Sequence, residues 1–355
     1  MFTQRIHNTH PLYPYRHNIF PMEIRKIQVT GGSSYVLSLP KTWVRERKIQ
    51  KNDPIGVVSQ ADGTLLLTPN IHYDSTVRIK EFALKDYPDP GMLLRSLIGA
   101  YISGFTSIKI TSAGRIPPKV RQAVRKFTQM TIGQEVADET ENSILLKDIL
   151  NPTEMPFENT LRRMYIIVKA MHNDALYSLV QGKRDLAEDV VARDTDVDRL
   201  HWLIHRQFSL IVENPALSLK MDVTPMLAAT YHQISRIIER VGDHAVLIAE
   251  SSLILMEKGL DRQTTAKIGE FGEESHTMFN RAIQTVFSGS IAGANKIIAD
   301  NEELEQKYHI LADSTRKMKA QDAVALNQIV NSLHRITEYS SDIAEILINR
   351  MVAEF

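Results

Sequence analysis

RIIERVGDHAVLIAE, residues 236–250, is the stretch that decides how the second half of this chain folds. Its apolar spacing predicts a helix, yet it holds Gly242 in mid-helix and two carboxylates, Glu239 and Asp243, four residues apart. Glycine costs a helix interior about 1 kcal/mol relative to alanine, and like charges at this spacing repel. Two penalties in one turn raise the question of what holds these residues there.

The stretch occurs twice. RITEYSSDIAEILIN, residues 335–349, places Arg335, Glu338 and Asp342 where the first copy has Arg236, Glu239 and Asp243. A second pair of segments, beginning at Gly182 and Gly289, also aligns, with a shorter connection between the two aligned segments in the second copy. FSLIVENPALSLKMDV, residues 208–223, is the expected place of the extra residues in the first copy. The repeat predicts two three-helix units.

Amphipathic spacing without a strand pattern predicts an all-α region from about residue 155. Helices are expected near 158–182, 184–213, 221–258, 263–289, 291–320 and 322–353. Turns are expected at Gly182, Pro215, Gly259 and Gly289. Six helices of this length predict two bundles, residues 155–260 and 261–355.

The first half of the chain contains strand patterns, unlike the helical second half. Residues 22–72 predict short strands around one or two helical turns, with a hairpin over IGVVSQ and GTLLLTP. Residues 75–150 alternate strand and helix, which predicts a small α/β domain without a motif that assigns it a role. Residues 1–21 contain no apolar segment of the signal-peptide type, and we expect a disordered arm.

Composition limits the chemistry. The chain has no cysteine, which excludes disulfides, thiolate metal sites and cysteine nucleophiles and predicts a cytoplasmic protein. The 42 basic and 42 acidic residues balance, but Met1–Lys51 carries nine Lys or Arg against two Asp or Glu. No apolar run approaches the roughly 18 residues that span a bilayer. The basic front end hints at nucleic-acid binding.

Glu239 and Asp243 project from one helix face, so a cation would turn their repulsion into attraction. His244 could add a nitrogen ligand, and the small residues Gly242 and Ser341 would allow close approach. The second helix of each unit adds further acids; these are Asp194 and Asp198 in the first copy and Asp300 and Glu305 in the second.

The alternative is a solvated helix face. Arg236 and Arg240 could form surface ion pairs with Glu239 and Asp243, each contributing only a few tenths of a kcal/mol. The occurrence of the pattern in both copies favours the metal hypothesis over this one.

Residues 236–250 resemble the signature helix of PhoU-type phosphate-uptake regulators, R-x-x-E-R-x-G-D-H-A-x-N-I-A-E, with Leu247 in place of the usual Asn. The resemblance implies two tandem three-helix bundles whose acidic pairs bind divalent or trivalent metal ions, iron or zinc first. The implied ligands are Glu239, Asp243, Glu338 and Asp342, followed by Asp194 and Asp198. Asn301 stands where Asp194 would map, which weakens the second copy's site.

Residues 23–58 resemble AbrB/SpoVT-type DNA-binding domains, through Leu39-Pro40-Lys41, Trp43 and Arg45. The resemblance implies a β-rich swapped-hairpin fold that forms an intertwined homodimer on duplex DNA. The residues expected to contact phosphates are Arg25, Lys26, Lys41, Arg45, Arg47 and Lys48. Alternatively, these charges only solubilise a small dimerisation module.

The combination is similar to archaeal regulators of phosphate uptake that bind DNA and carry metal-loaded bundles. DNA, a second copy, and a phosphate transporter or signalling protein would be partners. Two other functions stay open: a scaffold that binds no metal, and a metal-dependent enzyme. We expect no enzyme, because the Glu-x-x-His pattern of di-iron bundles is missing and no Ser/His/Asp arrangement can be read.

Overall fold

The computed structural model describes residues 23–59, 63–69, 78–151, 154–214, 216–256, 261–315 and 320–354. The chain divides into two compact units, Met1–His72 and Tyr73–Phe355. The predicted arm at residues 1–21 and the predicted turns at Pro215 and Gly259 lie outside the described residues.

The first unit consists of two hairpins and a short helix. β1 (Gln28–Thr30) pairs antiparallel with β2 (Ser34–Val36) across Gly31 and Gly32, whose φ angles of 65° and 83° suit glycine. After α1 (Lys41–Glu46), β3 (Gly56–Ser59) pairs antiparallel with β4 (Leu65–Thr68), as predicted. The strands are shorter than the β-rich segments suggested, and none of the described residues of this unit is buried.

The second unit begins with an α/β layer. Its elements are β5 (Ile79–Ala83), the 3-10 turn η1 (Leu84–Asp86), α2 (Pro90–Ile102), β6 (Ser107–Thr111), α3 (Pro118–Met130), β7 (Gln134–Glu139) and β8 (Ser143–Asp148). The strand order is β5-β6-β8-β7, with only β5 and β6 parallel. Asp89 caps α2 by accepting hydrogen bonds from the amides of Gly91 and Met92. The alternation predicted for residues 75–150 is therefore confirmed.

Long helices make up the rest of the chain. They are α4 (Phe157–Gln181), α5 (Arg184–Glu213), the short α6 (Ala216–Lys220), α7 (Pro225–Met256), α8 (Arg262–Ser288), α9 (Ile291–Thr315) and α10 (Ala320–Glu354). Gly182 and Gly289 end α4 and α8 in the left-handed conformation, each with φ of 65°. α6 occupies the connection that the repeat predicted to be longer in the first copy. Among the described residues, no helix has the length and apolar character needed to cross a membrane.

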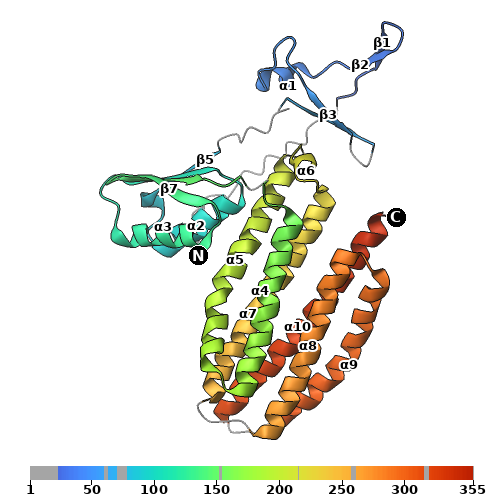
Figure 1. Cartoon of the computed structure of the whole chain (residues 1–355). Helices are drawn as coiled ribbons and strands as arrows, with labels where there is room; N and C mark the ends of the chain where they lie inside the picture. Colours follow the sequence, from blue (N-terminus) through green and yellow to red (C-terminus); the bar gives the residue numbers. More distant parts are fainter. Residues whose placement is uncertain are drawn as a thin grey trace, which may run out of the picture. The chain divides into compact units, whose positions relative to one another are not determined.

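The long helices form two three-helix bundles (Figure 1), which share one apolar core. The first bundle is α4, α5 and α7, and the second is α8, α9 and α10; α7 packs along α10 and α4 along α8. Equivalent ion pairs mark the repeat: Arg193 on α5 binds Asp174 on α4 at 2.5 Å, and Asp300 on α9 binds Arg281 on α8 at 2.5 Å. Both bundles thus contain this ion pair, with the acid and the base exchanged between the first and second helices.

One buried arginine joins the α/β layer to the first bundle. Arg206 on α5 has a side chain only 1% exposed, and its Nη2 lies 2.6 Å from Oδ2 of Asp148 at the end of β8. Its Nη1 also donates to the carbonyl oxygens of Tyr101 and Phe105. Because an unpaired charge is costly in such a place, these bonds fix α5 against α2 and the sheet.

Two glycine-to-alanine substitutions test the helix packing. At Gly272 on α8, a Cβ would lie 2.5 Å from Cδ2 of the buried Leu176 on α4, so Gly272→Ala should cost about 1 to 3 kcal/mol. At Gly242 on α7, the nearest atom would lie 3.4 Å away, so Gly242→Ala should be neutral or stabilise by up to about 1 kcal/mol. Urea unfolding of both variants measures the difference; equal effects would contradict the packing of α4 on α8.

The arginine bridge gives a second prediction. Arg206→Met leaves the carboxylate of Asp148 buried without its partner, and we expect a loss of about 3 to 5 kcal/mol. The double variant Arg206→Met, Asp148→Leu removes the orphaned charge and should recover most of that loss in the same unfolding experiment. A double variant no more stable than Arg206→Met would contradict the bridge.

Candidate functional site

Four carboxylates line the contact between α5 and α7, and we call them the acidic seam: Asp194, Asp198, Glu239 and Asp243. Asp194 and Asp198 lie one turn apart on α5, as do Glu239 and Asp243 on α7. Their electrostatic coupling shows that the two pairs face each other: Asp194 and Asp243 both raise the pKa of Asp198. The structure thus joins the two acidic pairs that the sequence predicted for the first bundle.

Burial and mutual repulsion hold protons on the seam. Burial, followed by the charges of Asp243 and Asp198, raises the pKa of Glu239 to about 7. Burial, followed by Asp194 and Asp243, raises the pKa of Asp198 to about 6. The pKa values of Asp194 and Asp243 are raised as well, mainly by burial. At neutral pH the seam therefore carries negative charge that its surroundings oppose.

Arginine does not neutralise the seam. Within the described part of the chain, no ion pair joins Glu239 or Asp243 to a lysine or arginine. Arg240 lowers the pKa of Glu239, but burial and the neighbouring carboxylates outweigh it. The Arg240 guanidinium lies 5.8 Å from the Tyr339 ring on α10. The structure thus does not support the surface ion pairs of the solvated-face alternative.

Two expectations about the neighbours of Asp243 need correction. Gly242 faces Val168 on α4 and Val197 on α5, and a Cβ at this position would lie 3.4 and 3.5 Å from their methyl groups, so the glycine faces the core and does not open the helix to a ligand. His244 lies against α10, where its ring centroid is 5.7 Å from that of Tyr339. Burial lowers the pKa of His244 to about 4, with Arg335 and Arg240 adding to the effect. It does not belong to the seam.

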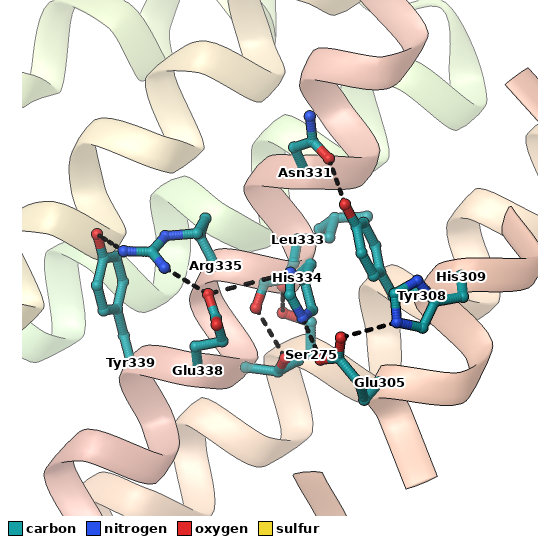
Figure 2. A network of polar contacts seen from close by, with 11 residues as sticks. Ser275, Glu305, Tyr308, His309, Asn331, Leu333, His334, Arg335, Glu338 and Tyr339 are labelled. Carbon is teal, nitrogen blue, oxygen red and sulfur yellow. Dashed lines mark hydrogen bonds and ion pairs between the residues drawn. The ribbon is translucent and has the colours of Figure 1, made fainter. Parts of the chain in front are cut away.

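The second bundle arranges its acids differently (Figure 2). Glu305 on α9 binds Nε2 of His334 on α10 at 2.5 Å and Nε2 of His309 at 3.1 Å. Glu338 binds Nη1 of Arg335 at 2.5 Å and lies 4.0 Å from Nδ1 of His334. The acids of this bundle are thus partnered by imidazole and guanidinium groups.

The remaining acids of the second bundle do not rebuild the seam. Asp342 has its pKa raised by burial and by Glu345 and Glu338. Asp300 is committed to Arg281, and Asn301 stands at the position of Asp194 with a buried Oδ1 that has no hydrogen-bond partner among the described residues. The expected acidic contribution of Asp300 is therefore wrong, and the two bundles are not equivalent.

The sequence analysis overlooked one acid. Glu250 raises the pKa of Asp194 and so extends the seam along α7. The signal was available, since Glu250 lies seven residues after Asp243 and hence on the same helix face.

The acidic seam offers carboxylate oxygens that suit a metal ion, but these oxygens are not yet arranged around one point. Carboxylate oxygens suit hard or borderline cations, and a cation would offset the repulsion that raises the pKa of Glu239. Across the described ranges, however, no three His, Asp or Glu side chains already converge to hold an ion. The seam residues fit a metal chemically, and binding would require their side chains to turn inward.

The basic residues predicted to contact DNA are all exposed in the first unit. Lys41 and Arg45 lie one turn apart on α1, and Arg47 and Lys48 follow directly; Arg25 and Lys26 precede β1, where Arg25 pairs with Glu23. The same unit exposes large apolar side chains, among them Ile24 at 90% and Tyr35 at 79%. This surface lacks a covering layer within the described residues of the unit.

Family models match both parts of the chain. The PhoU domain matches residues 161–252 and 268–347, and the antidote-toxin recognition domain MazE, a bacterial antitoxin, matches residues 28–72. The first pair of ranges corresponds to the two bundles, and the second range to the hairpin unit.

Several known proteins resemble the helical part. A phosphate-specific transport system accessory protein PhoU homolog of Caulobacter vibrioides is 26% identical over 192 residues, covering 52% of this chain and 82% of the relative. Its counterpart in Pseudomonas aeruginosa is 22% identical over 190 residues, covering 51% and 76%. The crystal structure of PhoU from Pseudomonas aeruginosa shares the fold, with a TM-score of 0.50 at 19% identity, over 56% of this chain and 96% of that one.

The matches agree with the helix boundaries, the internal repeat and the front-end hairpins already described. The chain is thus similar to the MazE antitoxin domain over its N-terminal hairpins and to a tandem pair of PhoU domains over its two helical bundles.

Proposed function

We propose that this protein regulates phosphate transport, binding DNA through its first unit and a metal ion in the acidic seam. The observation that carries the proposal is a region similar to tandem PhoU domains whose first bundle holds three half-buried carboxylates and the more exposed Asp243, with no basic ion-pair partner for Glu239 or Asp243 among the described residues. Relatives of that region are named accessory proteins of phosphate-specific transport systems. A phosphate transporter or its signalling protein is therefore the partner we propose for the bundles.

The seam would hold the ion through Glu239, Asp243, Asp198 and Asp194. A divalent or trivalent ion such as iron or zinc supplies the positive charge that these oxygens lack. In the second bundle, Glu338 and Asp342 remain proposed ligands, but Glu338 would have to leave Arg335 first. The first bundle is thus the stronger of the two proposed sites.

The first unit would bind DNA as a homodimer. Its exposed basic side chains provide phosphate contacts, while Ile24, Ile27 and Val29 are too exposed for a unit that acts alone. A second copy would cover these apolar side chains and place two basic surfaces side by side. Such a dimer would act in the cytoplasm, where its DNA lies.

The seam makes a prediction about pH. Because the folded pKa of Glu239, about 7, lies above its ordinary value, the folded state binds this proton more tightly than the unfolded state. The resulting stability is present at low pH and is lost as the pH rises through 7. Metal-free Glu239→Gln should therefore match the parent at pH 4, below the ordinary glutamate pKa of 4.5, and exceed it at pH 8 by about 1 to 2 kcal/mol, allowing for solvent screening.

The same variant tests the metal. Iron or zinc should raise the melting temperature of the parent protein at pH 7.5 and bind to it by elemental analysis, and Glu239→Gln should lose both effects. Glu188→Gln, which removes an exposed acid from the neighbouring helix α5, is the matched control and should behave like the parent. Equal metal content in the parent and in Glu239→Gln would favour the metal-free scaffold.

DNA binding is tested through its salt dependence. The parent should shift a promoter fragment of phosphate-transport genes, and Lys41→Gln, Arg45→Gln should weaken binding and flatten the slope of log K against log salt by about 2. Lys296→Gln, on the exposed surface of α9, is the control. Failure to shift any genomic fragment at low salt would remove DNA binding from the proposal.

A further inference from the structure

Three imidazoles meet in the contact between α5 and α7, next to the acidic seam. His201 and His205 lie one turn apart on α5, and His232 faces them from α7. The ring centroids of His205 and His232 are 4.3 Å apart, and those of His201 and His232 are 6.2 Å apart. Phe208 stacks on His232 at 4.8 Å, so the rings are packed but remain partly exposed. We call these residues the histidine cluster.

Burial and nearby positive charge make the three imidazoles weaker bases than usual, so they are neutral at pH 7 and Arg236 carries the positive charge of the cluster. Burial lowers the pKa of His201 to about 4, and His232, His205 and Arg236 each add to the effect. Burial also lowers the pKa of His232 to about 4, with His205 and Arg236 adding to it, and that of His205 is lowered by burial and Arg236. Among the described residues, no carboxylate raises any of the three values. Asp198, one turn before His201, is coupled instead to Asp194 and Asp243.

Arg236 belongs to this cluster, as comparison with the second copy shows. Its equivalent, Arg335, binds Glu338 three residues later at 2.5 Å and also donates to Tyr339. Within the described residues, Arg236 forms no such ion pair with Glu239, and it acts instead on the pKa values of all three histidines. Arg236, one turn along α7 from His232, therefore lies near enough to all three imidazoles to oppose their protonation.

The second copy closes the same place with neutral groups (Figure 2). Tyr308 and Asn331 stand at the positions of His201 and His232, and the Tyr308 hydroxyl donates to Asn331 Oδ1 at 2.9 Å. Ala312 stands at the position of His205. The repeat thus fills this contact with a satisfied hydrogen bond in one bundle and with four basic side chains in the other.

A metal ion fits the cluster poorly. A shared zinc ion would require three nitrogens to converge at about 2.0 to 2.1 Å from one point. The His201 and His232 rings are instead nearly parallel, at 9° and 6.2 Å, and the described residues hold no converged ligand set. The positive charge of Arg236 opposes a cation further. An anion with several acceptor oxygens can accept from donors that lie this far apart.

We propose that His201, His205, His232 and Arg236 form a binding site for a tetrahedral oxyanion. The choice of inorganic phosphate as its ligand rests on the proposed function; the site itself rests on the cluster. Guanidinium groups match the geometry of phosphate oxygens, and imidazolium adds charged N–H donors. Ser235 holds His201 in place, because its hydroxyl donates to the His232 carbonyl at 2.8 Å and lies 3.1 Å from His201 Nδ1.

Binding of an anion should draw protons onto the cluster. A negative charge beside an imidazole favours its charged form, so the pKa values that burial lowers would rise again on binding. Phosphate binding at pH 6, where the free imidazoles are neutral but a moderate rise in pKa suffices to protonate them, should therefore take up protons. A site built from arginine alone would not show this uptake.

The test is isothermal titration of the full chain with inorganic phosphate at pH 6, in two buffers of different ionisation enthalpy. The metal-free parent should bind phosphate with proton uptake. Arg236→Gln should weaken binding by about tenfold or more, and the triple change of His201, His205 and His232 to Gln should abolish the proton uptake. Arg335→Gln, the same change at the equivalent position of the second copy, should leave binding unchanged.

Other variants separate this site from the seam. Glu239→Gln removes the proposed metal site and should keep phosphate binding, so the two proposals can fail independently. Circular dichroism melting confirms that each variant is folded before titration. Phosphate binding that is lost with Glu239→Gln, or that survives in both Arg236→Gln and the triple variant, would overturn the proposal. Retention of zinc through the histidines, without phosphate binding, would overturn it too.

Discussion

The constraint on which the structure depends is the position of α7, which packs against α4, α5 and α10 at once. A helix covered on so many sides buries most of its length, and Ile234, Ile238, Val241 and Ile248 are accordingly fully enclosed. Polar side chains on such a helix reach water poorly, so each needs a partner or raises the free energy of the folded state. Glu239 and Asp243 meet other acids on α5 instead of a base. The two features of residues 236–250 that disfavour a helix thus lie on different faces: Gly242 faces the valines of α4 and α5, where an alanine would also fit, and Glu239 and Asp243 face the acids of α5.

The repeat shows how two copies of one backbone diverge in charge. The ion pair of Asp174 with Arg193 reappears as Arg281 with Asp300, with its charges exchanged. Structural pairs of this kind need only opposite signs, which explains why either order is tolerated. The acidic seam and the histidine cluster differ between the two bundles in another way. In the second bundle, acids pair with bases and the tyrosine bonds to an asparagine. Among the described residues of the first bundle, Glu239 and Asp243 have no basic ion-pair partner, and the imidazoles of the cluster are neutral at pH 7. Unbalanced charge in a stable fold is a mark of ligand binding.

Local sequence patterns predicted those features that depend on neighbours along the chain. Such local features include the helix ends at Gly182 and Gly289 and the alternation of strand and helix in residues 75–150. The shared helix face of Glu239 and Asp243 is another. The features that the patterns did not predict depend on contacts between distant positions. Arg206 reads as one more charge on an amphipathic helix until Asp148, 58 positions away, is placed beside it. His244 looked like a ligand because it adjoins Asp243 in sequence, although consecutive residues point to different helix faces. His232 gave no signal, because its partners lie on another helix.

The seam and the histidine cluster occupy neighbouring turns of the same two helices. The positive charge of the cluster is that of Arg236, which lies one turn before Glu239 on α7. A cation in the seam and an oxyanion in the cluster would each lower the electrostatic cost of the other, since opposite charges attract across this short distance in a partly buried site. Binding linkage is reciprocal, so whatever factor the metal gives to anion affinity, the anion gives to metal affinity. Because Arg206 ties α5 to the α/β layer, a change in the packing of α5 against α7 would also act on that layer. The α/β layer is thereby rigidly connected to the bundle that would bind the proposed ligands, whereas a flexible spacer would not be.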